Sequence, residues 1–368
     1  MIDPLPLAQA LLRCPSVTPQ DAGAQAYLAA ELQSYGFNVT RLKFGAIENL
    51  YAERGTMGQR LCFAGHTDVV PPGNGAWRHD PFGGVVDNGV LYGRGACDMK
   101  GAVAAFVAAA AQADQRQRLA LFITGDEEGD AVDGTAPVLE WMQANQKIPD
   151  FCIVGEPTCK VKLGDVVKIG RRGSLNARIT LTGRQGHAAY PHLADNPIHK
   201  LLPALAAMAA HRLDAGTAWF EPSSLQITSV DVGNAASNVI PAQISAKLNI
   251  RFNDLHHAAS LSDWLTETLA AFAPAADLQI HCSGEAFLTA PGPAVTQLVT
   301  AITTATNVTP KLDTGGGTSD ARFIARYCPV AEFGLVGSSM HQVDECVPVS
   351  ELRQLSDIYL AIIESFAA

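Results

Sequence analysis

Residues 61–68 read Leu-Cys-Phe-Ala-Gly-His-Thr-Asp, an apolar run that ends in a histidine and a carboxylate. A short apolar run bounded by a glycine predicts a buried strand, which here covers residues 61–64. In an open α/β sheet, ligands bind at the carboxyl ends of the strands. We therefore expect His66 and Asp68 to lie at the functional edge of a sheet.

Other apolar runs along the chain also end in acidic or imidazole side chains. The predicted strands 119–123 and 151–154 lead into Thr-Gly-Asp-Glu-Glu and Gly-Glu-Pro, and another aspartate precedes an alanine-rich helix predicted at 101–113. Strands alternate with helices here, including a helix at 135–144, which favours a mostly parallel α/β sheet covered by helices on both faces. The polar residues that follow these runs are His66, Asp68, Asp98, Glu127, Glu128, Glu156 and His341.

The pattern of elements changes after about residue 173. Strands and helices then follow in the order β-α-β-β-α-β, with helices at 197–212 and 258–272, which is the ferredoxin-like pattern. A chain of 368 residues is too long for one ordinary core. We therefore expect a catalytic domain formed by residues 1–173 and 285–368, with an inserted α+β domain at 174–284.

Composition excludes several classes of protein. The formal charge of −10 and the absence of a basic block argue against a nucleic-acid partner. No apolar run is long enough to cross a bilayer, and the N-terminal residues lack the pattern of a signal peptide. The eight cysteines are scattered without a CxxC pair, which predicts reduced, buried thiols in a cytoplasmic protein.

The polar residues at the strand ends predict a metal centre. Carboxylates held together repel one another, and bound cations remove that cost. Two imidazoles and three carboxylates without a thiolate suit Zn²⁺, Mn²⁺ or Co²⁺. Asp98, Glu128 and Glu156 supply three negative charges and a bridging hydroxide would supply a fourth, which together balance two divalent ions. A bridging Asp98 would give each ion one histidine, one terminal carboxylate, the shared aspartate and the shared hydroxide, with an exchangeable position.

Three acidic residues have roles that depend on their neighbours. Glu127 and Glu128 are adjacent, so one can bind metal while the other stays free as a general base. Asp68 lies two positions from His66 and can accept the second imidazole N–H, which fixes the tautomer. The alternative for Asp68 is a turn residue that caps local backbone.

At this point the chain resembles the M20 metallopeptidase family over nearly its whole length. The segments that carry the resemblance are GHTDVVPPG (65–73), RGACDMKG (94–101), TGDEEGDAVDGT (124–135), VGEPT (154–158), GRRGSL (170–175), QGHAAYPHLADNPIH (185–199), NVIPA (238–242) and TGGGTSDARF (314–323).

The resemblance implies a dinuclear zinc hydrolase, with Co²⁺ able to substitute. More narrowly, the segments resemble members of the family that cleave N-succinyl-L,L-2,6-diaminopimelate into succinate and L,L-2,6-diaminopimelate, a step in lysine and cell-wall precursor synthesis. By the same resemblance Asp98 bridges, Glu127 is the general acid and base, Asp68 orients His66, and the peptide after Asp98 is cis. The implied metal ligands are His66, Asp98, Glu128, Glu156 and His341.

The resemblance also implies a homodimer that forms through the inserted domain, which acts as a lid. His187 would reach the partner's active site and stabilise the oxyanion; the alternative is a surface histidine at a turn. The substrate carries three carboxylates, which arginines suit. The positions that match substrate contacts are Arg171, Tyr190, Asn238, Arg251, Gly317 and Thr318.

The chain departs from the family at Gly337 and Ser237, where relatives often have asparagine, and this affects substrate contacts rather than the metal site. Alternatives within the family are an acetylornithine deacetylase, an aminoacylase or a carboxypeptidase. A silent binding protein with the same fold would lack a ligand or the base, and none is missing here. A Rossmann dehydrogenase is poorly supported because no GxGxxG opens a helix after the first strand.

Overall fold

The structure, a computed structural model, describes residues 2–367 and divides into two compact units. The second unit comprises Gly170–Leu288 and the loop Thr314–Thr318, and the first unit comprises the remainder. The sequence placed the inserted domain at 174–284 and assigned 314–318 to the catalytic domain. The loop belongs to the second unit because Thr314 donates a hydrogen bond to the carbonyl oxygen of Trp219 there.

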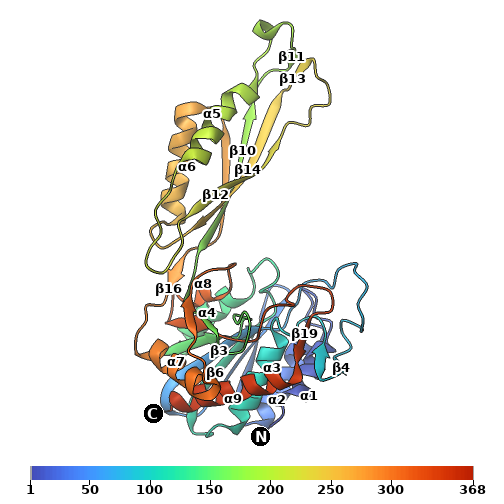
Figure 1. Cartoon of the computed structure of the whole chain (residues 1–368), viewed down its shortest axis with the longest axis vertical. Coiled ribbons are helices and arrows are strands. Elements are labelled where there is room, and N and C mark those ends of the chain that lie inside the picture. The colour runs from blue at the N-terminus through green and yellow to red at the C-terminus, as the bar shows by residue number, and fades with distance from the viewer. Residues whose placement is uncertain (1, 368) are drawn as a thin grey trace. The chain divides into compact units, whose positions relative to one another are not determined.

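An eight-stranded sheet in the order β1-β2-β6-β3-β7-β18-β8-β17 forms the core of the first unit (Figure 1). The central pairings of β3 with β6 and β7, and of β7 with β18, are parallel, whereas β1–β2, β2–β6 and β8–β18 are antiparallel. The strands are β1 (Asn38–Phe44), β2 (Ile47–Arg54), β3 (Met57–His66), β6 (Gln117–Thr124), β7 (Phe151–Val154), β8 (Val166–Lys168), β17 (Lys311–Asp313) and β18 (Val330–Glu332).

Helices cover both faces of this sheet, as the alternation of elements predicted. β6 and β7 flank β3, so the crossovers β3-α3-β6 and β6-α4-β7 run in opposite directions across the sheet. Since such crossovers are right-handed, α3 and α4 lie on opposite faces. The helices are α1 (Leu5–Leu12), α2 (Ala24–Ser34), α3 (Lys100–Gln112), α4 (Thr135–Ala144), α7 (Pro293–Thr306), α8 (Ala321–Ile324) and α9 (Val349–Ser365).

The alanine-rich helix α3 is buried all round. Every residue from Lys100 to Ala110 is buried, because α3 packs between α1 and α9 as well as against β3. Small side chains allow this close packing, and a helix that is apolar on all sides belongs in a core. The first turn of α3 is thereby held rigidly at the carboxyl edge of the sheet.

A small three-stranded sheet borders the first unit. It contains β4 (Val85–Asp87), β5 (Val90–Tyr92) and β19 (Cys346–Pro348) in the order β19-β5-β4, all antiparallel. The pairing of β5 with β19 brings the loop before α3 next to the loop that precedes α9. These loops carry Asp98 and His341.

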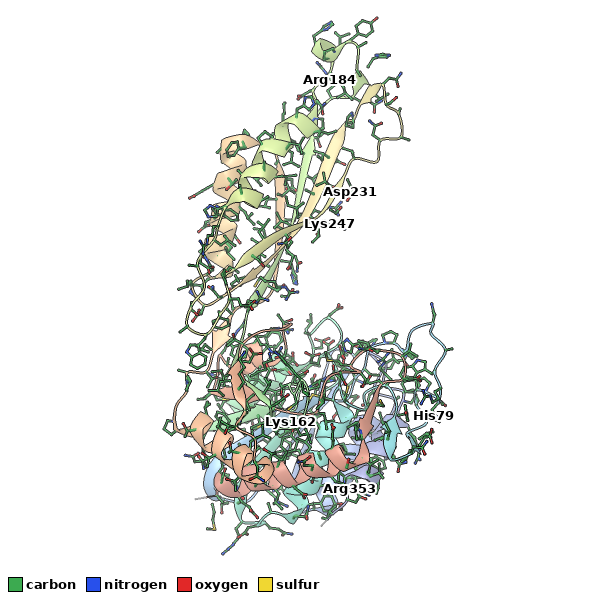
Figure 2. The ribbon with its side chains drawn as sticks, viewed as in Figure 1. His79, Lys162, Arg184, Asp231, Lys247 and Arg353 are labelled. Atoms are coloured by element: carbon green, nitrogen blue, oxygen red, sulfur yellow. The ribbon has the colours of Figure 1, made fainter. Side chains whose placement is uncertain are left out.

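The second unit is an antiparallel sheet, β12-β14-β10-β15, with α5 and α6 packed against it (Figure 1). In chain order the elements are β-α-β-β-α-β, the predicted ferredoxin-like arrangement. Apolar residues alternate with polar ones such as Lys247, which is exposed (Figure 2). The elements are β10 (Gly173–Thr182), α5 (Pro197–Ala210), β12 (Ser224–Asp231), β14 (Gln243–Phe252), α6 (Ala258–Phe272) and β15 (Asp277–Gly284).

Short ladders extend this unit. β9 (Gly170–Arg171) pairs with β16 (Phe287–Leu288), and β11 (Gly186–His187) pairs with β13 (Val239–Ile240). A 3₁₀ turn, Pro191–Leu193, follows β11.

Two expectations concern the whole chain. No helix between residues 2 and 367 has the length and apolarity needed to span a membrane. All eight cysteines are unpaired, and Cys62, Cys97, Cys152, Cys159 and Cys328 are buried, as predicted for most of them.

Candidate metal centre

Five elements bring the predicted ligands to one edge of the first unit. His66 ends β3, Asp98 lies in the turn before α3, Glu128 follows β6, and Glu156 follows β7. His341 comes from the loop between β18 and β19. The crevice beside β3, where the crossovers change direction, is the position at which such sheets bind ligands.

These side chains form two donor groups that share Asp98. His66 Nε2 lies 3.2 Å from Asp98 Oδ1 and 3.7 Å from Glu156 Oε1. His341 Nε2 lies 3.2 Å from the other oxygen, Asp98 Oδ2, and 2.8 Å from Glu128 Oε1. Two donors about 2.0 Å from a tetrahedral zinc ion lie about 3.3 Å apart, so the residues fit two such ions bridged by Asp98.

The carboxylates shift the protonation of the histidines strongly. Hydrogen bonds to Asp98 and Glu128 raise the pKa of His341 to about 10. Burial by itself would lower the pKa of His66, but the hydrogen bond to Asp98 and the nearby Asp68 and Glu127 raise it well above its usual value. The cluster therefore favours positive charge, which protons supply here and which divalent cations can supply instead.

Asp98 is unusually acidic for a buried carboxyl. Burial by itself would raise the pKa of this carboxyl, but the hydrogen bonds with His341 and His66 hold the pKa well below its usual value. The peptide bond from Asp98 to Met99 is cis, as the resemblance predicted.

Asp68 fixes both His66 and the Glu127–Glu128 turn. Its main-chain oxygen lies 2.9 Å from His66 Nδ1, whereas its carboxylate oxygen lies 3.6 Å from the same atom. The carboxylate instead accepts hydrogen bonds from the backbone N–H groups of Glu127 and Glu128, at 3.2 and 2.9 Å. The backbone of Asp68 thus makes the hydrogen bond to His66, while its carboxylate holds the backbone of the Glu127–Glu128 turn, which is distant in sequence and is not the local backbone that the alternative interpretation named.

Glu127 lies next to the donor group of His66 and Glu156. One of its carboxylate oxygens lies within 4.8 Å of ligand atoms of His66 and Glu156. Burial, together with the charges of Glu156 and Asp320, raises the pKa of the Glu127 carboxyl well above its usual value. A carboxyl with a high pKa next to a metal centre suits proton transfer.

The other predicted residues lie in the second unit and fall into two sets. The first set lies near the first residues of the unit and the loop Thr314–Thr318. Arg171 Nη1 donates a hydrogen bond to the carbonyl oxygen of Gly317 at 3.2 Å, and Thr318 is the next residue of that loop. Arg251 lies at the same end, because it pairs with Ser174 at the start of β10. Burial and the charge of Arg172 lower the pKa of the Arg251 guanidinium.

The second set lies at the far end of the same sheet, beyond the end of β10. His187 and Asn238 are neighbours here, because β11 pairs with β13 and Ala188 N–H donates to the Asn238 carbonyl oxygen at 2.8 Å. Tyr190 is exposed, with its ring centre 5.6 Å from that of His187. The ten residues of β10 separate the two sets by about 30 Å, so the unit does not bring them together.

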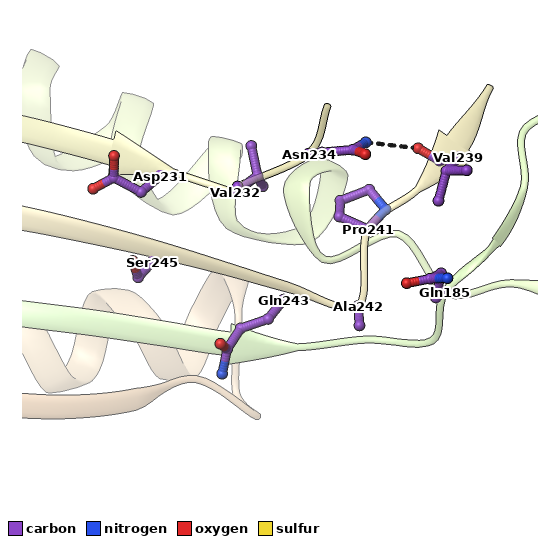
Figure 3. Close-up of a pocket in the computed structure, with 10 residues that line it drawn as sticks. Gln185, Asp231, Val232, Asn234, Val239, Pro241, Ala242, Gln243 and Ser245 are labelled. Carbon is purple, nitrogen blue, oxygen red and sulfur yellow. Dashed lines mark hydrogen bonds between the residues drawn. The ribbon is translucent and has the colours of Figure 1, made fainter. Parts of the chain in front are cut away.

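A polar pocket of about 400 Å³ lies beside the second set (Figure 3). Residues from the end of β12 and from the segment around β13 line it, and Asn234 Nδ2 donates to the carbonyl oxygen of Val239 at 2.8 Å. This hydrogen bond closes the loop that contains Asn238 and Ser237.

Two buried residues beside the centre were missed from the sequence. Arg94 and Glu345 form an ion pair behind Asp98 and His341, with Nη1 and Oε2 2.7 Å apart. A signal was available, since Glu345 directly precedes the strand-like Cys-Val-Pro-Val and Arg94 lies in the quoted RGACDMKG segment.

The chain is similar to known proteins over most of its length. The sequence pattern of Peptidase family M20/M25/M40 matches residues 62–365. A protein of Acidiphilium cryptum described as succinyl-diaminopimelate desuccinylase is 62% identical over 98% of this chain and 98% of its own length. One of Gluconacetobacter diazotrophicus with the same description is 58% identical over 98% and 96%.

Solved structures share the fold at low sequence identity. An M20 family metallo-carboxypeptidase of Sulfolobus solfataricus superposes with a TM-score of 0.80 at 15% identity, over the full length of both chains. A Bacillus subtilis protein described as a dinuclear metal-binding peptidase of the M20 family gives 0.73 at 14% identity, over 98% of this chain and 96% of that one. A family pattern covers most of the sequence, and relatives are 62% and 58% identical over 98% of it, so this chain belongs to Peptidase family M20/M25/M40.

Proposed function

We propose that this chain hydrolyses the amide bond of N-succinyl-L,L-2,6-diaminopimelate to give succinate and L,L-2,6-diaminopimelate, in lysine and diaminopimelate biosynthesis. One observation carries the proposal: two donor groups share Asp98 in a chain that is 62% identical, over 98% of its length, to a relative described as succinyl-diaminopimelate desuccinylase. The cytoplasm is the proposed location, since eight unpaired cysteines suit a reducing compartment.

The donor set supports two Zn²⁺ ions, with Co²⁺ as a substitute. His66, Glu156 and Asp98 Oδ1 would hold one ion, and His341, Glu128 and Asp98 Oδ2 the other. Such ions, when bound, polarise the amide carbonyl and lower the pKa of water. Nitrogen and oxygen donors without thiolate are typical of catalytic rather than structural zinc.

The protein's own residues then carry out the proton transfers. Glu127 takes a proton from the attacking water and later delivers it to the leaving amine. The main-chain oxygen of Asp68 holds His66 Nδ1 protonated, so that Nε2 faces the ion. Arg171 and Arg251 bind substrate carboxylates, and Tyr190, Asn238, Gly317 and Thr318 contribute further substrate contacts.

A homodimer completes the proposed site. His187 of the partner subunit donates a hydrogen bond to the oxyanion that develops on the substrate. The separation of about 30 Å between the His187 end and the Arg171 end of one unit supports this arrangement, because one copy cannot offer both ends to a single small substrate.

The test compares substrates and metal states. We expect cleavage of the succinyl compound in the presence of Zn²⁺, loss of activity on chelation, and negligible cleavage of N-acetylornithine. Preference for acetylornithine would make the chain a deacetylase with the same metal chemistry. Turnover that persists in full after chelation would contradict the metal-dependent mechanism.

Glu127→Gln separates proton transfer from metal binding. The amide keeps the shape of the side chain but cannot accept a proton, so we expect kcat to fall by about 10²–10⁴-fold. Metal content, measured by atomic emission, should stay at the wild-type value because the donor groups around Asp98 remain. Substantial residual turnover would remove Glu127 from the acid–base role.

A further inference from the structure

Two loops of the metal centre start from one strand pair. β5 and β19 pair Tyr92 with Cys346, so the loop 93–99 that carries Asp98 leaves this ladder beside the loop 334–345 that carries His341. Strand pairing fixes only the residues where each loop joins its strand. The separation of Asp98 and His341 further along them depends on other contacts.

Arg94 and Glu345 form a buried ion pair between these loops. Their side chains are 2% and 0% exposed, and Arg94 also stacks over Trp77, with its guanidinium carbon 5.2 Å from the ring centre. Burying two charges is costly unless their remaining hydrogen-bonding groups are satisfied. In this pair both partners bind main-chain groups of the metal-centre loops, and Arg94 Nε alone of the guanidinium nitrogens makes no hydrogen bond.

Glu345 holds the Asp98 loop, and Arg94 holds the His341 loop. Glu345 Oε1 accepts hydrogen bonds from the N–H groups of Cys97 and Asp98, at 3.0 and 3.2 Å. Arg94 donates to the carbonyl oxygens of Gln342 and His341, at 3.2 and 3.3 Å. The ion pair therefore joins the backbone of Asp98 to the backbone of His341, whose side chains approach within 3.2 Å.

The other half of the centre has a different support. His66 is the last residue of β3, pairs with Thr124 of β6, and is almost inaccessible to solvent. His341 instead lies in an irregular loop, with a side chain 45% exposed and a left-handed backbone at φ +62°. The sheet thus holds His66, whereas the loop and its ion pair hold His341.

The geometry points to Arg94 and Glu345 as positioning residues that set the spacing of Asp98 and His341, and thereby the affinity of the His341 site for its metal ion. The inference rests on the proposed function, because it requires a two-metal centre. We expect a weaker ion pair to lower the metal affinity of the His341 site alone. His341 would become more mobile, while β3 and β7 still hold His66 and Glu156.

The test uses two conservative variants and stepwise metal titration. Arg94→Lys keeps the charge, but an ammonium lacks the planar fork that reaches Glu345 and two carbonyl oxygens together. Glu345→Gln keeps the size and an acceptor oxygen, but it weakens the bond to Arg94. Metal-free proteins are titrated with Co²⁺, followed by visible absorption and equilibrium dialysis. We expect the first ion to bind as in the wild type and the second to bind about 10–100-fold more weakly.

Arg54→Lys is the matched control. Arg54 is also a buried arginine that donates to main-chain oxygens, including those of Tyr35 and Ala113, and it stacks 4.6 Å from the Phe37 ring centre. It pairs with Leu119 at the start of β6, the opposite edge of the sheet from His66. This variant should lower the melting temperature and leave both metal affinities unchanged.

The outcomes separate this inference from the proposed function. Wild-type protein that binds fewer than two ions would overturn both. Wild-type protein that binds two ions, together with Arg94 and Glu345 variants that bind both with unchanged affinity, would overturn the inference alone. Equally weaker binding of both ions in the Arg94 and Glu345 variants would also overturn it. So would weaker binding of the second ion in the Arg54 control, since either result indicates a general loss of stability.

Discussion

At the scale of single residues, Asp98 belongs to both donor groups of the centre. Each of its oxygens faces one histidine, and each histidine has its own terminal carboxylate. In the metal-free protein, protons on the histidines offset this negative charge. Metal ions and protons therefore compete for the same sites.

This competition predicts how pH acts on the metal-free protein. The pKa of His341 is about 10 in the folded state and about 6.5 when unfolded. A raised folded pKa gives a stabilising contribution that is complete below about pH 6.5 and is lost as the pH rises towards 10. The free energy of unfolding in chelator, from urea denaturation, should fall across this interval.

A His341→Asn variant is the control for the pH effect. Without the imidazole, the decline in stability between pH 6.5 and 10 should be smaller than in the wild type. Zn²⁺ affinity of the wild type should rise over the same interval, because fewer protons remain to be displaced. A stability that is flat in chelator would contradict the assignment.

Gly337 lies too close to the backbone of residue 157 for a larger side chain. A Cβ added there would lie 2.9 Å from the carbonyl oxygen of Pro157, a backbone atom next to Glu156. An asparagine side chain should therefore not be tolerated here, and Gly337→Asn should lower the free energy of unfolding by about 1–3 kcal/mol without lowering KM. Ser237→Asn, at an exposed position, should change stability by less than about 0.5 kcal/mol. A lower KM for Gly337→Asn would contradict this explanation.

At the scale of elements, the start of α3 sets the position of Asp98. Lys100 N–H donates to the Gly95 carbonyl oxygen at 3.0 Å, and the Lys100 ammonium donates to the Cys14 carbonyl oxygen at 2.8 Å. Burial lowers the pKa of this lysine to about 8. The turn 95–99 is thus enclosed between a buried helix and the edge of the sheet.

Gly101 tests how tightly this turn is packed. A Cβ there would lie 2.2 Å from the backbone oxygen of Ala96, so Gly101→Ala must displace the turn that carries Asp98. The alanine gains about 1 kcal/mol of helix propensity but should still lower the free energy of unfolding by about 1–3 kcal/mol, and it should weaken metal binding. Gly317→Ala is the control for stability, since its Cβ would meet no atom within 4 Å. Unchanged stability and metal affinity in Gly101→Ala would show that the turn can adjust.

At the scale of the whole molecule, the proposed dimer predicts complementation between inactive copies. A Glu127→Gln subunit and a His187→Ala subunit are co-expressed with different tags and purified through both. One of the two sites in this heterodimer has Glu127 from one subunit and His187 from the other, so about half of the wild-type activity should return.

The control places both substitutions in one subunit, paired with a wild-type subunit. If His187 acts in the partner's site, neither site of this heterodimer is complete and activity should stay low. If His187 acts within its own subunit, this heterodimer should keep about half of the activity instead, and the first should stay inactive.

The elements that the sequence predicted well have strong local signals. The ranges 135–144, 151–154 and 258–272 match α4, β7 and α6, because amphipathic or apolar periodicity spans each element. The three-residue strands β8 and β17 were missed, since so few residues carry no periodicity. Their parallel pairing, Val166–Lys168 with Lys311–Asp313, depends on segments that are distant in sequence.

The sequence by itself determined the fold class and which side chains gather at the sheet edge, because parallel strands align their carboxyl ends whatever the details of packing. Only the tertiary structure decided how these side chains divide around the two oxygens of Asp98, and that the backbone of Asp68 binds His66. It alone revealed the Arg94–Glu345 pair and the separation of His187 from Arg171. These features depend on distances between segments remote in sequence, which local patterns of polarity do not encode.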